Sequence, residues 1–197
     1  MLESLAPNIP VYTAPQALMD EIAGFPIHRG ILACAKKGDA LPLDDFLGAK
    51  RLLVLNEISN HDNVGAAFRN AAAFGADGVL IDAGSCDPLY RKAIRVSSGS
   101  SLWLPYHHGG TGLDQIEALK GAGFEIWAMT PRADAVPLHT LTPPDKLAIL
   151  LGAEGPGLPE ALIEAAQPVR IPMRAGFDSV NVATAGAIAL AHVFNSD

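Results

Sequence analysis

Polar residues gather where an apolar run of the sequence gives way to a helical pattern. The first such stretch, NEISNHDNVGAAFRNAAAFG at residues 56–75, holds four asparagines and one arginine. Asp62 or Asn63 is predicted to cap the helix, because a side-chain oxygen at the cap accepts a hydrogen bond from a free backbone amide. Gly65 then permits a close approach of the backbone near the first helical turn.

Arg69 and Asn70 lie beyond the first turn, so capping does not explain them. A guanidinium and several amides at one place can position a polar substrate and stabilise negative charge that develops on an oxygen. The alternative is structural: Asn63 caps the helix and Arg69 is a solvated residue on its surface. The two other polar stretches favour the chemical interpretation.

The second stretch is LLGAEGPGLPE at residues 150–160, in which a strand runs into three glycines before a helix. It differs from a phosphate-binding loop, since the glycines are Gly152, Gly155 and Gly157 and no lysine follows. Glu154 would repel a pyrophosphate, so the loop suits a neutral or cationic ligand better. The alternative is a tight turn between strand and helix, where glycine and proline are common.

The third stretch is VRIPMRAGFDSVNVATAGAIALAHVF at residues 169–194, in which a strand, a glycine-containing loop and a helix of small residues follow one another. Ser179 and Asn181 bring polar groups to the start of that helix. Taken alone, Asp178 or Ser179 would be a routine helix cap.

Short β-rich runs alternate with helical patterns from residue 51 onward, and this alternation must position the three stretches. The predicted strands lie within residues 51–58, 77–82, 102–107, 124–130, 146–152 and 169–173. Near-continuous apolar strands that alternate with helices predict an α/β fold, with a parallel sheet covered by helices on both faces. In such sheets the ligand lies beyond the carboxyl ends of the strands, where the three stretches fall.

The amino-terminal part has less material for a core. Residues 9–14 and 29–36 are predicted strands, and residues 15–24 are a predicted helix. These elements make about half a domain, too little to hold a core alone. We therefore predict a partial domain at residues 1–38, a polar linker at 39–49 and one α/β domain at 50–197.

Composition limits the partners of the chain. A formal net charge of −7 in 197 residues argues against a nonspecific nucleic-acid binder, so any contact with a polyanion must be local. Cys34 and Cys86 stand far apart, so we expect no disulfide framework, no metal site and two buried thiols. No apolar run reaches the roughly 18 residues of a spanning helix and no signal peptide is evident, so we expect a cytoplasmic protein without a membrane partner.

Three segments, NHDNVGAAFRNAAAFG, LLGAEGPGL and IPMRAGFDSVNVATAGAIAL, resemble in order and spacing the three motifs of the SpoU (TrmH-like) family. That family comprises RNA ribose 2′-O-methyltransferases of the knotted SPOUT class, and the resemblance covers residue 51 to the carboxyl terminus. It implies S-adenosyl-L-methionine as cofactor, tRNA or rRNA as substrate, and a trefoil knot in the carboxyl-terminal part. It does not identify the RNA or the nucleotide that is modified.

The resemblance also implies roles for site residues. Backbone groups around the cofactor are implied at Leu151, Gly152, Ile171, Met173 and Val180. The implied catalytic residues are Arg69, Asn63, Glu154, Ser179 and Asn181. Family mechanisms make Arg69 the base, but an arginine with a pKa above about 12 is hard to deprotonate. Charge stabilisation or phosphate positioning by Arg69, with help from Asn63, is physically easier, and the identity of the base stays open.

Two further regions bear on the RNA. Residues 9–37 resemble the second half of the family's small ribosomal-protein-like RNA-recognition domain, so residues 1–38 are expected to contribute to substrate binding. The segment DPLYRKAIRVSSGS also resembles the family, and its Arg91, Lys92 and Arg95 are candidates for local phosphate contacts. The alternative for these three cations is a solvated helix face.

The resemblance implies a homodimer as well. The helix at residues 181–194 is apolar almost all round, which is more than one core-facing stripe requires. Its small side chains would let a partner helix approach closely; these are Ala183, Gly186, Ala187 and Leu190. The alternative is complete burial of the helix inside one subunit.

Two rival functions come from other classes of protein. A nucleotide-phosphate-binding α/β enzyme is disfavoured by Glu154 and by the missing lysine. A catalytically silent RNA-binding relative is disfavoured because every expected catalytic residue type is present. Cofactor calorimetry separates the first rival from a methyltransferase, and a methyl-transfer assay separates the second.

Overall fold

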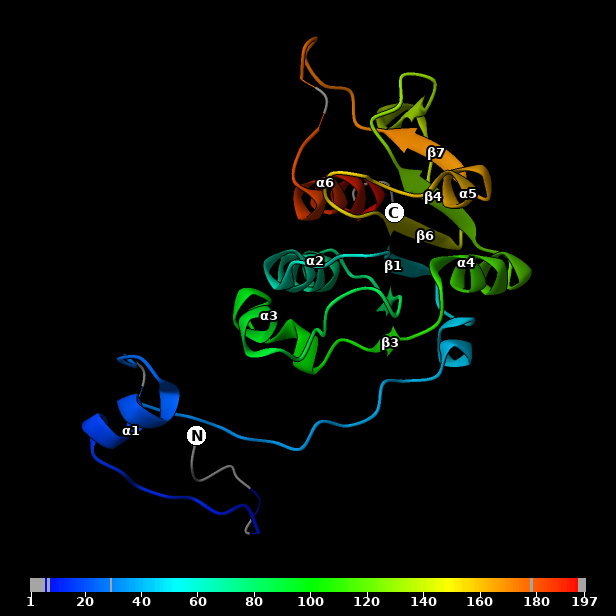
Figure 1. Ribbon diagram of the computed structural model, residues 1–197. Helices are drawn as coiled ribbons and strands as arrows, with labels where there is room; N and C mark the ends of the chain where they lie inside the picture. The colour runs from blue at the N-terminus through cyan, green and yellow to red at the C-terminus, as the bar shows by residue number, and fades with distance from the viewer. Residues whose placement is uncertain (1–5, 7, 29, 178, 195–197) are drawn as a thin grey trace. The chain divides into compact units, whose positions relative to one another are not determined.

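The computed structural model describes residues 6, 8–28, 30–177 and 179–194, which belong to two compact units, residues 1–38 and 39–197. The larger unit contains a seven-stranded sheet in the order β3-β2-β1-β6-β4-β7-β5, and every pair of neighbouring strands is parallel (Figure 1). The strands are β1 (Arg51–Leu55), β2 (Gly78–Ile81), β3 (Tyr106–His108), β4 (Glu125–Met129), β5 (Val136–Pro137), β6 (Leu147–Leu151) and β7 (Gln167–Arg170). The predicted parallel sheet is confirmed, and the two-residue β5 is an addition that the sequence pattern did not predict.

Helices cover both faces of this sheet, as predicted. In Figure 1, α2, α3 and α6 lie on one side of the strands and α4 and α5 lie on the other. The helices of this unit are α2 (His61–Ala73), α3 (Arg91–Val96), α4 (Gly112–Gly121), α5 (Glu160–Glu164) and α6 (Val182–Phe194), with short 3-10 turns η2 (Leu43–Phe46), η3 (Ser100–Leu102) and η4 (Leu138–Thr140).

The apolar character of β1 explains why two helical layers are needed. Successive side chains of a strand point to opposite faces, so Leu53 and Leu55 belong to the core beneath α2 and α6. Leu52 and Val54 belong to the other core, with the apolar residues of α4 and α5. All four side chains are at most 1% exposed, so water contacts neither face of β1.

The strand register brings the loops of the three polar stretches to one edge of the sheet. Leu55 pairs with Leu151, so β1 and β6 end side by side. The backbone amide of Asn56 still donates to the carbonyl of Leu151 at 2.9 Å, and the loops diverge only after this bond. Because β4 and then β7 follow β6 in the sheet, the loops after all four strands meet at this carboxyl edge.

The segment at residues 39–49, expected as a linker, groups with the larger unit. Phe46 in η2 is 3% exposed and joins the core beneath α4 and α5. The backbone amide of Leu41 donates to the carbonyl of Tyr106 at 3.1 Å, next to the short strand β3.

The smaller unit contains one regular element, α1 (Gln16–Ala23), among its described residues. The helix prediction is thus confirmed, whereas the strands predicted at residues 9–14 and 29–36 are wrong: none of the residues described there is in a strand. A strand is held by hydrogen bonds to a neighbour and by a packed face, and an isolated pair is marginal in water. No described residue of this unit is buried, which agrees with the expectation that it cannot hold a core alone.

The absence of a side chain at Gly65 allows α2 and α3 to pack closely. A Cβ at Gly65 would lie 2.6 Å from the carbonyl oxygen of Ala93 and 2.9 Å from Cβ of Val96. We expect Gly65→Ala to lower the free energy of unfolding by about 1–3 kcal/mol in urea denaturation, because backbone must move. The matched control is Gly121→Ala in α4, where a Cβ would meet nothing within 4 Å. Equal stability of the two variants would contradict the close approach.

Candidate active site

The start of α2 differs from the prediction in a way that matters for the site. Asn60 caps the helix, its side-chain oxygen accepting from the backbone amide of Asp62 at 2.9 Å. The prediction that Asp62 or Asn63 is the cap is therefore wrong, because the helix begins earlier, at His61. Asn63 lies inside the first turn and its side chain is free to contact another element.

Asn181 joins the three polar stretches. Its side-chain oxygen accepts from the backbone amides of Ala183 at 3.0 Å and Thr184 at 3.2 Å, so Asn181 caps α6. Its Nδ2 donates to Oδ1 of Asn63 at 2.9 Å and to Oε1 of Glu154 at 3.1 Å. One carboxamide thus connects the first turn of α2, the loop after β6 and the start of α6.

The alternative interpretation of the third stretch made Asp178 or Ser179 the cap of α6. Ser179 is not that cap. A cap oxygen must face the free amides of the first turn, and Asn181 already satisfies those amides. The other candidate for the cap, Asp178, lies outside the described residues.

The network also fixes the orientation of both amides. Because two backbone donors face the oxygen of Asn181, its nitrogen must face Asn63 and Glu154. Asn63 must then present its oxygen to Asn181, and its Nδ2 is buried with no hydrogen-bond partner in the described structure. A buried donor without a partner costs on the order of 1–3 kcal/mol, and such groups recur at functional sites.

A second contact holds α6 against α2. Nδ2 of Asn70 donates to the backbone carbonyl of Ala183 at 2.8 Å. Asn63 and Asn70 are seven residues apart, so both lie on one face of α2. Asn70 therefore serves to position the start of α6, a role that the sequence left unassigned.

These contacts border a cavity of about 370 Å³ at the carboxyl edge of the sheet. Its lining combines ends of strands with the loops that follow them. The lining residues are Met129, Thr130, Pro131, Leu151, Gly152, Ala153, Glu154, Gly155, Gly157, Ile171, Met173, Ser179, Val180, Asn181, Val182 and Ala185.

The cavity brings together most of the residues singled out from the sequence. All five expected cofactor residues line it, namely Leu151, Gly152, Ile171, Met173 and Val180. Of the expected catalytic residues, Glu154, Ser179 and Asn181 line it as well, and Asn63 reaches it through Asn181. Their roles stay predictions, because this shared location is geometry alone.

One wall was missed by the sequence analysis. Met129, Thr130 and Pro131 stand at the end of β4 and just after it. The signal was available, since every strand of a parallel sheet ends at the same edge. The apolar run at residues 124–130 carries no unusual polar residue, so nothing drew attention to it.

The glycines of the loop after β6 serve a tight turn. A Cβ at Gly152 would lie 2.6 Å from the backbone nitrogen of Leu158, so only glycine fits. The backbone amide of Gly157 donates to the carbonyl of Ala153 at 3.1 Å, and Gly157 has φ of 74°. The structural interpretation of this loop is correct, and the turn also leaves its backbone facing the cavity.

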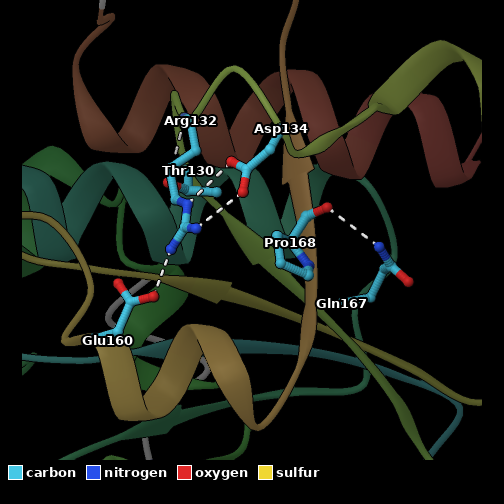
Figure 2. A network of polar contacts seen from close by, with 6 residues as sticks. All are labelled: Thr130, Arg132, Asp134, Glu160, Gln167 and Pro168. Atoms are coloured by element: carbon cyan, nitrogen blue, oxygen red, sulfur yellow. Dashed lines mark hydrogen bonds and ion pairs between the residues drawn. The ribbon is translucent and has the colours of Figure 1, made fainter.

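A charged network ties the β4 wall to the helix after this loop. Figure 2 shows Arg132 between Asp134 and Glu160, the first residue of α5. The guanidinium donates to both carboxylate oxygens of Asp134, at 3.0 and 2.9 Å, and to Glu160 at 2.5 Å. Arg132 holds the pKa of the Asp134 carboxyl below its ordinary value. Because all three side chains are at least 38% exposed, these ion pairs add little to the free energy of unfolding. We therefore assign the network the role of positioning the two loops.

The expected cationic residues lie outside the cavity lining. Arg69 is exposed on α2, beside Asn70, and makes no hydrogen bond or ion pair in the described part of the chain. Arg91, Lys92 and Arg95 are exposed on α3. Lys92 pairs with Asp62 at 2.8 Å, so only two of the three charges on α3 are uncompensated within the described ranges.

The two cysteines differ in burial. Cys34 is exposed, so the prediction of two buried thiols is wrong for it: its unit has no core to bury it. Cys86 is partly buried, which raises the pKa of its thiol. Within the described ranges, no group of three or more His, Cys, Asp or Glu is placed to hold a metal ion. No helix there has the length and apolar character to cross a membrane.

Substitutions of Asn181 can separate its cap from its bridge. We expect Asn181→Ala to lower the free energy of unfolding by about 1–2 kcal/mol or more, because the cap and two further hydrogen bonds are lost. Asn181→Ser restores a cap oxygen on a side chain too short to bridge Asn63 and Glu154, so it should recover part of the loss. Urea denaturation measures both variants, and equal stability of Asn181→Ser and Asn181→Ala would contradict the cap.

The chain matches the SpoU rRNA Methylase family over residues 50–191. It is 40% identical over 185 residues to an uncharacterized tRNA/rRNA methyltransferase of Mycobacterium bovis, covering 91% of this chain but only 64% of that relative. It is 28% identical over 195 residues to a putative TrmH family tRNA/rRNA methyltransferase of Staphylococcus aureus, covering 95% of this chain and 78% of the relative.

Solved structures agree with this match. The AdoMet-bound rRNA methyltransferase of Sinorhizobium meliloti superposes with a TM-score of 0.72 at 28% identity, over 78% of this chain and 59% of that one. An RNA 2′-O ribose methyltransferase superposes with a TM-score of 0.66 at 29% identity, over 87% of this chain and 62% of that one. The family match covers most of the α/β unit, including the first two polar stretches and all but the last three residues of the third, and the chain therefore belongs to the SpoU rRNA methylase family.

Proposed function

We propose that this chain catalyses the S-adenosyl-L-methionine-dependent methylation of a ribose 2′-hydroxyl in tRNA or rRNA. The observation that carries the proposal is the bridge of Asn181 to Asn63 and Glu154 beside the cavity. Related proteins support it, because one structural neighbour is bound to AdoMet and another is an RNA 2′-O ribose methyltransferase. The chain spans only 64% of the length of the mycobacterial relative, so the activity of the whole protein is part of the proposal.

The cavity fits the proposed cofactor in size and charge. A volume of about 370 Å³ lies within the usual range for small-ligand sites. Glu154 is the one ionisable side chain among its described lining residues. A carboxylate without any cation suits a neutral adenosine and a cationic sulfonium, and it disfavours a nucleotide phosphate.

The proposed holders of the cofactor are the strand ends and loops of the lining. Ile171 and Val180 offer apolar surface for an adenine, and the strand end at Leu151 and Gly152 brings backbone groups close to the cavity, while the Leu151 side chain is buried in the core. Glu154, Ser179 and Asn181 order the loops around it. When bound, S-adenosyl-L-methionine supplies an electrophilic methyl group.

Arg69 takes the substrate side in this proposal. It is an exposed cation without a partner in the described chain, one residue before Asn70, which holds the start of α6. A cation there can hold a phosphate of the RNA and stabilise negative charge on the ribose oxygen as it loses its proton.

Three finer features belong to the same proposal. We propose a trefoil knot in the carboxyl-terminal part, supported by β6 lying between β1 and β4 and by the contacts of α6 with α2. We propose that residues 1–38 are part of a substrate-binding domain and that residues 50–197 are the catalytic domain, with which residues 39–49 group. Arg91, Lys92 and Arg95 are proposed to contact the RNA.

The central test combines binding with turnover. We expect the protein to bind S-adenosyl-L-methionine at one site per subunit in calorimetry without added metal. Arg69→Ala should keep the dissociation constant within a few-fold and abolish incorporation of labelled methyl groups into RNA from a strain that lacks the protein. Arg69→Lys, which keeps the charge, serves as the matched control. If the folded protein shows no detectable cofactor binding at millimolar concentration, the proposed function is overturned. If Arg69→Ala turns over at nearly the normal rate, the proposed role of Arg69 is overturned.

We also propose a homodimer through α6, with a contact surface that differs from the one suggested by the sequence. Ala183, Gly186 and Leu190 are buried inside the subunit, so they are not the contact suggested by the sequence, whereas the fourth residue suggested, Ala187, is only partly buried and stays in the proposal. Ile188 is 38% and Phe194 56% exposed, which leaves apolar surface on α6 to cover.

We expect light scattering at micromolar concentration to give the mass of a dimer, and Ile188→Glu to reduce it toward that of a monomer, because an interface would bury the charge. Ile188→Ala should keep the dimer. A monomeric wild-type protein with full methyltransferase activity would defeat the proposal, and a dimer that tolerates Ile188→Glu would move the interface elsewhere.

A further inference from the structure

An aromatic pair stands between the first turn of α2 and the start of α3. The rings of His61 and Tyr90 have centroids 4.2 Å apart and planes inclined by 43°. The loops that lead to them also touch, since the backbone amide of Cys86 donates to the carbonyl of Ile58 at 2.9 Å. Both rings follow strands β1 and β2, so they stand at the carboxyl edge of the sheet, as the cavity does.

The fold does not account for Tyr90. It occupies the cap position of α3, where Ser, Thr, Asp or Asn is favoured, and its side chain makes no cap hydrogen bond. The side chain is 46% exposed, so it contributes little to the core. In the described structure its contact with His61 is the interaction that orients the ring.

Charge surrounds this ring on α3. The ion pair between Lys92 and Asp62 at 2.8 Å links the same two helical turns and steadies the aromatic pair. Arg91 follows Tyr90 directly and Arg95 lies one turn further, both exposed and neither with an ion-pair partner in the described ranges. The segment thus offers two uncompensated cations beside an exposed ring, in a chain of net charge −7.

We propose that Tyr90 is a stacking platform for an unpaired base of the RNA, with Arg91 and Arg95 contacting the flanking phosphates. An exposed ring next to cations is the combination that binds single-stranded nucleic acid, because bases stack on the ring and phosphates meet the charges. A membrane or an acidic protein could also contact a tyrosine and two cations, and the match to an RNA methylase family favours RNA among them. The inference rests on the proposed RNA methyltransferase function and extends it to the recognition of an unpaired segment.

The test measures binding of a fluorescein-labelled single-stranded RNA of mixed sequence, about 12 nucleotides long, by anisotropy at several salt concentrations. We expect Tyr90→Ala to weaken binding about 5- to 150-fold at every salt concentration, without a change in the salt dependence. Tyr90→Phe keeps the ring and should bind like the wild type. Arg91→Gln combined with Arg95→Gln should instead flatten the slope of log K against log salt by about 1.4.

The remaining measurements make each result decisive. A duplex RNA of the same length should be nearly insensitive to Tyr90→Ala, because its bases are already stacked. The platform is overturned if Tyr90→Ala binds the single strand within about two-fold of wild type, if Tyr90→Phe loses as much as Tyr90→Ala, or if the wild type does not bind the single strand. A change of oligomeric state in Tyr90→Ala would make the ring a subunit contact and overturn it too. Calorimetry of S-adenosyl-L-methionine on the same variants distinguishes failure of the platform, with cofactor binding intact, from failure of the proposed function.

Discussion

The hydrogen bonds of the Asn181 carboxamide are the constraint on which the rest of the site depends. Its oxygen is committed to the backbone amides at the start of α6, and this commitment turns its nitrogen toward Asn63 and Glu154. A carboxylate or a hydroxyl could cap the helix but could not donate twice in the other direction. The cap of α6 requires an acceptor at this position and the contacts with Asn63 and Glu154 require a donor, so the residue must carry a carboxamide. The cavity borders this junction, so its shape follows from the same four bonds.

The parallel sheet supplies the place at which such a junction can form. Strands β1, β6, β4 and β7 are neighbours, although they come from distant parts of the sequence. Because parallel strands end at one edge, their loops meet without any long excursion of the chain. The helices on both faces keep this edge rigid, since β1 and β6 are buried on both faces. Polar groups at the edge can then hold fixed distances while the apolar interior bears the folding free energy.

The sequence predicted the elements with a strong local signal and failed where the decisive partner was remote. Apolar runs located β1, β2, β4 and β6, because burial of their side chains on both faces leaves a continuous pattern. The run predicted at 169–173 only overlaps the end of β7, in which Val169 is the one buried residue. The cap of α2 was misplaced because Asn60, Asp62 and Asn63 all suit that position, and only the tertiary bridge decides which side chain is free. The strands predicted in the smaller unit failed for the opposite reason: the local pattern is present, but no neighbouring strand completes it among the described residues. The wall at Thr130 escaped notice because its residues are chemically ordinary.

Pairing of charges separates the cations that hold structure from those whose charge is left uncompensated. Arg132 is neutralised by Asp134 and Glu160 and serves the folded chain, whereas Lys92 is paired with Asp62 in an exposed ion pair and carries less free charge than its neighbours on α3. Arg69, Arg91 and Arg95 are exposed and have no such partner in the described structure. Lys50 and Arg174 are also exposed without a side-chain partner there, so what sets these three apart is that they stand on the neighbouring helices α2 and α3, where the proposed function uses them to meet a polyanion. The net charge of −7 then limits binding elsewhere on the surface, so local cations and global acidity together favour a specific contact over a nonspecific one.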